Sequence, residues 1–121
     1  MSDLLAICRD IPYDADAERA VLGACLASGG EALSLIDFLT PDDFWEDVHQ
    51  GIYRAMRHLY RSEGKLDLVL LLDRLRRQGV LSERYAEGYV LSLADAVPSG
   101  EGGVQHARIV KREADRRRLL G

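Results

Sequence analysis

The chain of 121 residues has no long apolar run and holds few cysteines. No segment approaches the ~20 consecutive apolar residues needed to cross a bilayer. The N-terminal stretch has no basic start and meets Arg9 and Asp10 too early for a secretory signal, so we expect a cytoplasmic protein without a membrane anchor. Cys8 and Cys25 form no CxxC pair, so the sequence indicates neither a disulfide framework nor a zinc knuckle.

The motifs that usually carry catalysis or cofactor binding are also missing. There is no GxxxxGK[ST] loop for nucleotide phosphates, no HExxH zinc motif and no GxSxG nucleophile turn. The glycine-rich stretch 100–103 follows no expected strand, which argues against a dinucleotide site. His49, His58 and His106 show no metal-ligand spacing, and we expect them to be surface or boundary side chains. We therefore predict that this chain has no catalytic residue, no cofactor and no metal ion.

What the chain does contain is the composition of an ordinary folded domain, with 47% apolar and 30% charged residues. Its length suffices for one domain whose core needs no disulfide. The net charge is −4, but residues 1–50 carry 11 acids and 2 bases (net −9), whereas residues 51–121 carry 9 acids and 14 bases (net +5). This asymmetry either attracts the two halves to each other or offers a complementary surface to a partner or a second copy.

The hydrophobic pattern is helical throughout and shows no sustained period-2 alternation typical of strands. Asp14 is expected to cap a helix that extends to Ala27 and ends at Gly29 and Gly30. Because this helix is apolar on every side, we place it at the centre of the domain, with Gly23 allowing another backbone to approach closely. Further helices are expected at 31–39, 48–63, 68–78, 82–96 and 103–120, with a capped turn at Thr40 and Pro41.

Two of the expected helices have a clear apolar face. In the helix 48–63 this face consists of Val48, Ile52, Ala55, Met56 and Leu59, and in the helix 68–78 it consists of Leu68, Val69, Leu71, Leu72 and Leu75. Leu70 lies on the polar side of the second helix, either as a lone exposed leucine or as part of a contact patch. We expect Phe44 to lie in the core and Trp45 at its rim, directly after the capped turn.

The last expected helix is strongly basic. Its cations are Arg108, Lys111, Arg112, Arg116, Arg117 and Arg118. Such a helix can neutralise phosphates, so a small helical nucleic-acid-binding domain is one hypothesis. Against it, cations are favoured near the C-terminus of any helix, the chain is acidic overall, and no aromatic residue lies between these cations. The helix also ends without a cap or a return segment, which predicts that the chain is part of a longer protein.

Several stretches, in order and at similar spacing, resemble the N-terminal domain of bacterial replicative DNA helicases of the DnaB type. They are Asp16 to Gly23, Thr40 to Trp45 with His49 after it, Gly64 to Val69, Leu93 to Ser99, and Ala107 to Val110 with Arg117 to Leu119. The resemblance implies an all-helical head, a compact orthogonal bundle, followed by a helical hairpin, a linker and a RecA-like motor that uses ATP and magnesium. In this chain we expect an extension at 1–13, the head at 14–98 and the first hairpin arm at 99–121, without the motor.

The same resemblance implies a non-catalytic oligomerisation and protein-interaction role in the primosome. In the family the N-terminal domains form dimers, three of which build a collar on the hexameric ring, and the collar docks the C-terminal domain of primase. The helicase loader is a second expected partner, and DNA is contacted indirectly through the whole helicase. The expected partner-binding residues are Asp16, Leu70, Tyr89 and Leu120, and the expected contacts to DNA or to the second hairpin arm are Arg108, Arg112 and Arg116.

The chain departs from the family pattern at three places. Leu70 occupies a position that is usually polar, the glycine-rich stretch 100–103 predicts a mobile hinge before the arm, and Trp45 stands where tyrosine is common. Tyr89 lies beside an inward apolar stripe, either as an aromatic anchor at the rim or as a peripheral core tyrosine. Leu120 is either an exposed contact or part of a frayed terminus.

Overall fold

The computed structural model describes residues 11–95 and 102–120. Within these ranges the chain forms six α-helices and one short 3-10 helix without any strand, which confirms the all-α prediction. The elements are α2 (Ala15–Ala27), α3 (Glu31–Leu35), η1 (Pro41–Asp43), α4 (Asp47–Glu63), α5 (Leu68–Arg77), α6 (Glu87–Asp95) and α7 (Gly103–Leu120). None of the described helices is long and apolar enough to span a membrane.

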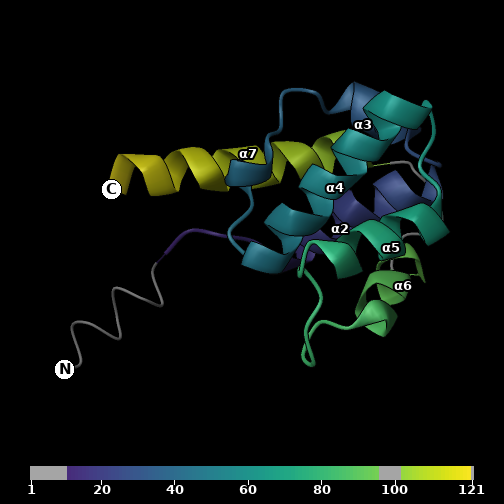
Figure 1. Cartoon of the computed structure of the whole chain (residues 1–121). Helices are drawn as coiled ribbons and strands as arrows, with labels where there is room; N and C mark the ends of the chain where they lie inside the picture. The colour runs from purple at the N-terminus through teal and green to yellow at the C-terminus, as the bar shows by residue number, and fades with distance from the viewer. Residues whose placement is uncertain (1–10, 96–101, 121) are drawn as a thin grey trace.

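Helix α2 lies at the centre of the bundle and packs against α3, α4, α6 and α7 (Figure 1). It begins after Asp14, whose carboxylate accepts a hydrogen bond from the backbone amide of Ala17 at 2.9 Å. Val21, Leu22 and Cys25 on this helix are fully buried. The prediction of an apolar central helix is therefore confirmed.

Helices α4 and α5 form a second layer against this centre. All five residues of the expected apolar face of α4 are buried, and Gly64 ends the helix in the left-handed region at φ 73°. Helix α5 buries Leu71 and Leu75 completely. Val69, which we expected on the core face, is 71% exposed, so that prediction is wrong. Helix α5 packs chiefly on α4, and its fully buried stripe is too narrow to include Val69.

Helix α3 is shorter than expected and ends at Leu35 instead of residue 39. The chain leaves helical geometry at Ile36, where φ is −114°. The hydroxyl of Tyr53, from α4, donates to the backbone carbonyls of Ile36 (3.4 Å) and Leu39 (3.1 Å). This buried tyrosine thus provides a partner for carbonyls beyond the helix end, which lets the helix stop early.

Helix α6 begins at Glu87, not at Ser82 as expected. The hydroxyl of Ser82 accepts from the backbone amide of Tyr85 at 3.1 Å, and the amide of Ser82 donates to the carbonyl of Tyr85 at 3.1 Å. These bonds close a separate turn that does not continue as a helix. The inward positions Val90 and Leu93 are buried as predicted, and the expected end at Ala96 lies outside the described residues.

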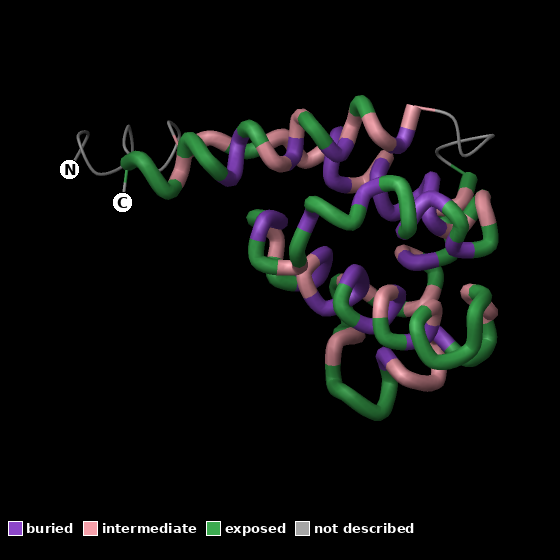
Figure 2. Tube along the Cα trace, turned by 90° about the horizontal axis from the view of Figure 1, so that it is seen from above, coloured by how far each residue is buried: buried purple, intermediate pink, exposed green. Residues whose placement is uncertain are grey.

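Helix α7 matches the expected range, and its first half packs against α2. Ala107 and Val110 are buried there, and a Cβ placed on Gly103 would lie only 3.2 Å from the Cβ of Ala24. This glycine therefore allows a close approach of the two helices, while residues 100 and 101 of the expected hinge lie outside the described residues. The second half of α7 extends beyond the other helices and carries mostly exposed or half-buried positions (Figures 1 and 2).

The boundary expected between head and arm at residue 98 stays a prediction. The first half of α7 nevertheless contributes Ala107 and Val110 to the same core cluster as α2 and α4. The expected extension at 1–13 lies largely outside the described residues, apart from its last residues. Of these, Pro12 accepts a hydrogen bond from Arg117 in the last turn of α7, and the ring of Tyr13 packs on the ring of Trp45.

Candidate protein-interaction site

The predicted partner-binding residues lie on four different helices. Asp16, in the first turn of α2, has 92% of its side chain exposed and pairs with Arg19. Leu70 on α5 is 45% exposed, and Leu120 near the end of α7 is 72% exposed. Tyr89 on α6 is half-buried and belongs to a polar cluster inside the bundle. Three of the four side chains are thus accessible to a partner, and the fourth lies at the rim of the core.

The cluster around Tyr89 consists of Glu18, His49 and Tyr89 and joins α2, α4 and α6. The Nδ1 of His49 lies 2.7 Å from Oε1 of Glu18, and its Nε2 lies 2.6 Å from the Tyr89 hydroxyl. Because an ionised carboxylate can only accept, Nδ1 carries a proton, and in the neutral ring Nε2 accepts from the hydroxyl. Burial raises the pKa of Tyr89 above its usual value, which keeps the hydroxyl protonated.

Glu18 is the centre of this cluster and is only 1% exposed. Its carboxylate also accepts from the backbone amides of Trp45 (2.7 Å) and Glu46 (3.3 Å), just before α4 begins. His49, which we expected at the surface or the boundary, is also 1% exposed, so that prediction is wrong. The ring can be buried because Glu18 and Tyr89 satisfy both of its nitrogens. The cluster therefore links α2, α4 and α6, and its two buried members, Glu18 and His49, are not accessible to a substrate.

Glu18 was not among the predicted site residues, although the sequence contains a signal for it. Glu18 is one acid on the buried side of a helix that is otherwise apolar there. A carboxylate in such a position needs hydrogen-bond donors nearby, because burying an unpaired charge is costly. Its donors come from residues that are 27 to 31 positions away in the chain, which no local pattern shows.

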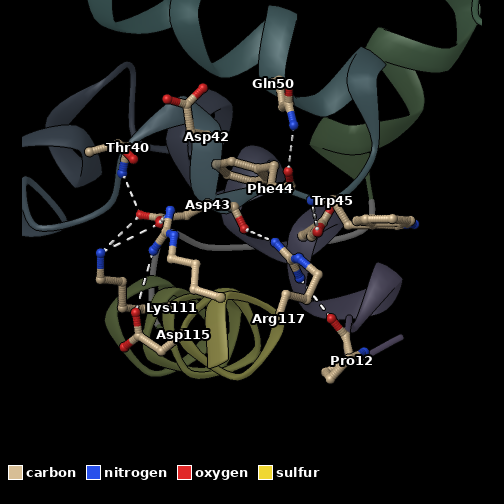
Figure 3. A network of polar contacts seen from close by, with 12 residues as sticks. Pro12, Thr40, Asp42, Asp43, Phe44, Trp45, Gln50, Lys111, Asp115 and Arg117 are labelled. Atoms are coloured by element: carbon tan, nitrogen blue, oxygen red, sulfur yellow. Dashed lines mark hydrogen bonds and ion pairs between the residues drawn. The ribbon is translucent and has the colours of Figure 1, made fainter. Parts of the chain in front are cut away.

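A second polar cluster centres on Asp43 and holds the extended part of α7 (Figure 3). The Asp43 carboxylate, which has no exposed surface, accepts from the Thr40 amide at 2.8 Å and from Arg118 at 2.6 Å. Lys111 lies 3.4 Å from both of its oxygens. Burial alone would raise the pKa of Asp43, but the Thr40 amide and the two cations outweigh it and hold this pKa below its usual value.

Arg117, in the last turn of the same helix, contacts Pro12 and the segment from Asp43 to Trp45. Its guanidinium donates to the carbonyl of Pro12 (2.8 Å) and to the carbonyl of Asp43 (2.7 Å), and it lies 5.5 Å from the centre of the Trp45 ring. The Trp45 ring also packs against Tyr13, with ring centres 5.9 Å apart. Trp45 is 40% exposed, so the prediction of a rim position for it is confirmed.

Most of the cations on α7 are engaged within the chain. Lys111, Arg117 and Arg118 contact Asp43, as described above. Arg112 and Arg116 pair with Glu113 at 3.2 and 3.3 Å, and Arg108 is exposed. Five of the six expected cations thus have internal partners, which weakens the hypothesis of a phosphate-binding helix.

Large apolar side chains remain exposed on several elements. They are Tyr13, Leu35, Phe38, Trp45, Val69, Leu70, Leu91, Leu119 and Leu120. Single exposed apolar residues are common on protein surfaces. Two pairs that are adjacent in the sequence stand out, because exposed apolar residues close together favour contact with another protein. These pairs are Val69 with Leu70 on α5 and Leu119 with Leu120 on the extended end of α7.

Comparison with known proteins gives a consistent result. The family model "DnaB-like helicase N terminal domain" matches residues 10–112. The replicative DNA helicase DnaB of Geobacillus stearothermophilus is 34% identical over 109 residues, which is 90% of this chain and 24% of the relative. The DnaB of Treponema pallidum is 36% identical over 109 residues, which is 90% of this chain and 25% of the relative. The chain thus spans about a quarter of the length of these relatives.

A solved structure agrees with these matches. The crystal structure of the N-terminal domain of DnaB helicase from Mycobacterium tuberculosis superposes with a TM-score of 0.83 at 31% sequence identity. The match covers 92% of this chain and 79% of the other chain. The fold and the order of elements described above are therefore those of a known helicase domain.

Proposed function

Because this chain belongs to the family of DnaB-like helicase N-terminal domains, we propose that it serves a replicative helicase as an oligomerisation and protein-interaction domain. The family domain is separate from the motor, so the chain itself carries no helicase chemistry. In this proposal it forms dimers in the N-terminal collar of a hexameric ring in the cytoplasm. It also docks the C-terminal domain of primase during DNA replication. ATP and magnesium act only at the motor of the whole helicase.

The observation that carries the proposal is the extended half of α7 with its exposed Leu119 and Leu120. These leucines are 87% and 72% exposed, although they directly follow Arg117 and Arg118, which bind Asp43 from the last turn of the helix. A helix whose last turn is held in place and still exposes adjacent leucines is suited to pack against another helix. We propose that this other helix is the second arm of the hairpin.

Sedimentation velocity tests the collar part of the proposal. A longer form of the protein that includes the second hairpin arm is expected to associate more strongly than the chain of 121 residues. A Leu119→Ser substitution in the longer form is expected to reduce this association, because it removes an exposed apolar contact. If the short and long forms sediment with the same association state, α7 is not an assembly helix.

Tyr89 is the proposed aromatic anchor for primase. The hydrogen bond from its hydroxyl to His49 holds the ring at the rim of the core, so little side-chain freedom is lost on binding. We expect Tyr89→Ala to weaken binding of the primase C-terminal domain by about 1 to 3 kcal/mol in calorimetry. Tyr89→Phe keeps the ring but loses the hydrogen bond to His49, so it is expected to weaken binding less than Tyr89→Ala does. Unchanged affinity of Tyr89→Ala, with helix content preserved, would contradict this assignment.

Asp16 and Leu120 complete the proposed primase-facing surface, and the exposed Leu70 on α5 is a further proposed contact. A helicase loader is the second proposed partner.

The alternative of a nucleic-acid-binding helix is tested by titrating labelled single-stranded DNA at low salt and at about 0.2 M salt. Under our proposal we expect no binding of the DNA that depends both on salt and on Arg108, Arg112 and Arg116. Such binding would favour the alternative.

A further inference from the structure

The outer face of α4 carries a group of cations that the proposed collar and primase contacts do not use. Arg54, Arg57, His58 and Arg61 follow one another at i, i+3, i+4 and i+7, so they share one face of the helix. Together with Pro41 they line a groove of about 420 Å³. We call this set the α4 basic groove.

A second hollow adjoins the α4 basic groove. It measures about 300 Å³ and shares Arg57 and Arg61 with the groove. Its other walls are Leu33, Ser34, Asp37 and Tyr60. The two arginines therefore form a ridge between the two hollows, and Leu33 and Tyr60 give the second hollow an apolar wall.

The arginines of the groove are only loosely compensated by acids of the same chain. Arg54 lies 3.9 Å from Asp42, and Arg61 lies 3.8 Å from Asp37, distances too long for hydrogen bonds. All four of these side chains are more than half exposed. Exposed pairs of this kind contribute little to stability, so an incoming carboxylate can replace them and form closer, bidentate contacts.

The groove is poorly suited to single-stranded nucleic acid. Proteins that bind such strands usually stack bases on exposed aromatic rings. The Tyr53 ring next to the groove is fully buried, and the guanidinium of Arg57 covers it at 5.8 Å from the ring centre. His58 is the one aromatic ring among the residues that line the groove, so the groove offers much positive charge and little stacking surface, which favours carboxylates on a peptide.

We propose that the α4 basic groove binds an acidic segment of another protein. In this arrangement carboxylates of the segment pair with Arg54, Arg57 and Arg61, and one neighbouring apolar side chain enters the hollow beside Leu33 and Tyr60. The site uses none of the residues proposed to dock primase or to extend the collar. The two proposals therefore succeed or fail independently.

Fluorescence anisotropy with three labelled probes tests this site. The probes are a peptide of six glutamates followed by leucine and phenylalanine, a peptide of eight glutamates, and an oligothymidylate of similar charge. In low salt we expect the first peptide to bind most tightly, because it alone offers both carboxylates and apolar side chains. Binding is expected to weaken as salt is raised, because the pairs are near the surface.

Paired substitutions identify the arginines responsible. Arg54→Gln with Arg61→Gln removes two exposed cations and is expected to weaken binding of the first peptide about fivefold to tenfold. Arg77→Gln with Arg84→Gln changes the net charge equally at exposed positions outside the groove and is expected to leave binding nearly unchanged. Circular dichroism checks that both variants keep the helix content of the parent.

A gain of affinity gives the sharpest test. Asp37→Asn with Asp42→Asn removes the two competing carboxylates and is expected to tighten peptide binding at least about threefold. Asp73→Asn with Glu83→Gln is the charge-matched control and is expected to have a smaller effect. The proposal is overturned if the first peptide does not bind, if the two arginine double variants lose affinity equally, or if the oligothymidylate binds more tightly through the same arginines.

Discussion

The Asp43 cluster yields a prediction whose magnitude follows from the structure. Asp43→Asn keeps an oxygen that can accept the Thr40 amide but removes the negative charge that faces Arg118 and Lys111. A hydrogen bond to a charged group contributes about 1.5 to 3 kcal/mol when it is buried. The Arg118 and Lys111 side chains are 49% and 35% exposed, so solvent reduces each contribution to about 1 kcal/mol or less.

We therefore expect Asp43→Asn to lower the free energy of unfolding by about 1 to 2 kcal/mol at neutral pH. The neighbouring Asp42→Asn is the matched control. Asp42 is 83% exposed and its pair with Arg54 spans 3.9 Å, so its substitution is expected to change stability by less than about 0.5 kcal/mol. Urea denaturation followed by circular dichroism measures both differences.

The same variant has a defined pH dependence. The pKa of Asp43 is lower in the folded chain than in the unfolded chain, so ionised Asp43 stabilises the fold above the unfolded pKa of about 3.9. This stabilisation is lost as the pH falls through the folded pKa. The difference between the parent and Asp43→Asn should thus shrink as the pH falls below the unfolded pKa of about 3.9 and approach zero once the pH is below the folded pKa. Equal effects of Asp42→Asn and Asp43→Asn at neutral pH, or a difference that does not depend on pH, would refute this account.

Three further predictions concern the core. In a Cys8→Ser variant, Cys25 is the only thiol. It is expected to resist thiol reagents at about pH 8 in the native state, because burial raises the pKa of its thiol to about 12. Rapid labelling without denaturant would contradict this. Gly51→Ala places a Cβ 2.8 Å from a methyl group of Val80. We expect this clash to lower the melting temperature and the free energy of unfolding by about 1 to 3 kcal/mol, which exceeds the gain in helix propensity. Glu18→Gln is expected to cost about 1 to 3 kcal/mol in urea denaturation, because an amide satisfies the buried donors less well than a carboxylate; a cost near zero would show that the charge is not required.

Local sequence signals were sufficient for much of the fold. The Asp14 cap, the all-round apolar segment up to Ala27 and the glycine at position 64 each act within a few residues of the helix end that they define. Helices α2, α4 and α7 were therefore predicted close to their observed ranges. The capped turn before Phe44 was predicted for the same reason, since the Thr40 amide bonds to Asp43 only three residues later.

Two of the errors, the expected position of His49 and the expected length of α3, arose where a distant residue decides the outcome, whereas the late start of α6 comes from a local turn at Ser82. His49 is buried because its partners Glu18 and Tyr89 lie 31 and 40 positions away, and Asp43 meets Arg118 across 75 positions. The local pattern of one amino-acid sequence does not show which distant residues form such pairs. The early end of α3 likewise depends on the hydroxyl of Tyr53, which a helical pattern does not show.

The resemblance to a helicase domain identified the family, whereas individual contact residues remain proposals. Helix propensity, caps and apolar faces determine which surfaces are exposed, and Leu70 and Leu120 are exposed as expected. Exposure alone does not select a partner. For Tyr89 both earlier interpretations describe part of the structure, because the ring lies at the rim while its hydroxyl is held inside by His49.

Sedimentation velocity of the chain mixed with the primase C-terminal domain of the same organism tests the central claim most directly. If the chain acts by binding other proteins, a faster boundary containing both proteins should appear, and its amount should fall with Tyr89→Ala but not with Asp73→Asn. Two boundaries that sediment independently at every concentration, or a mixture that is insensitive to Tyr89→Ala, would contradict the claim.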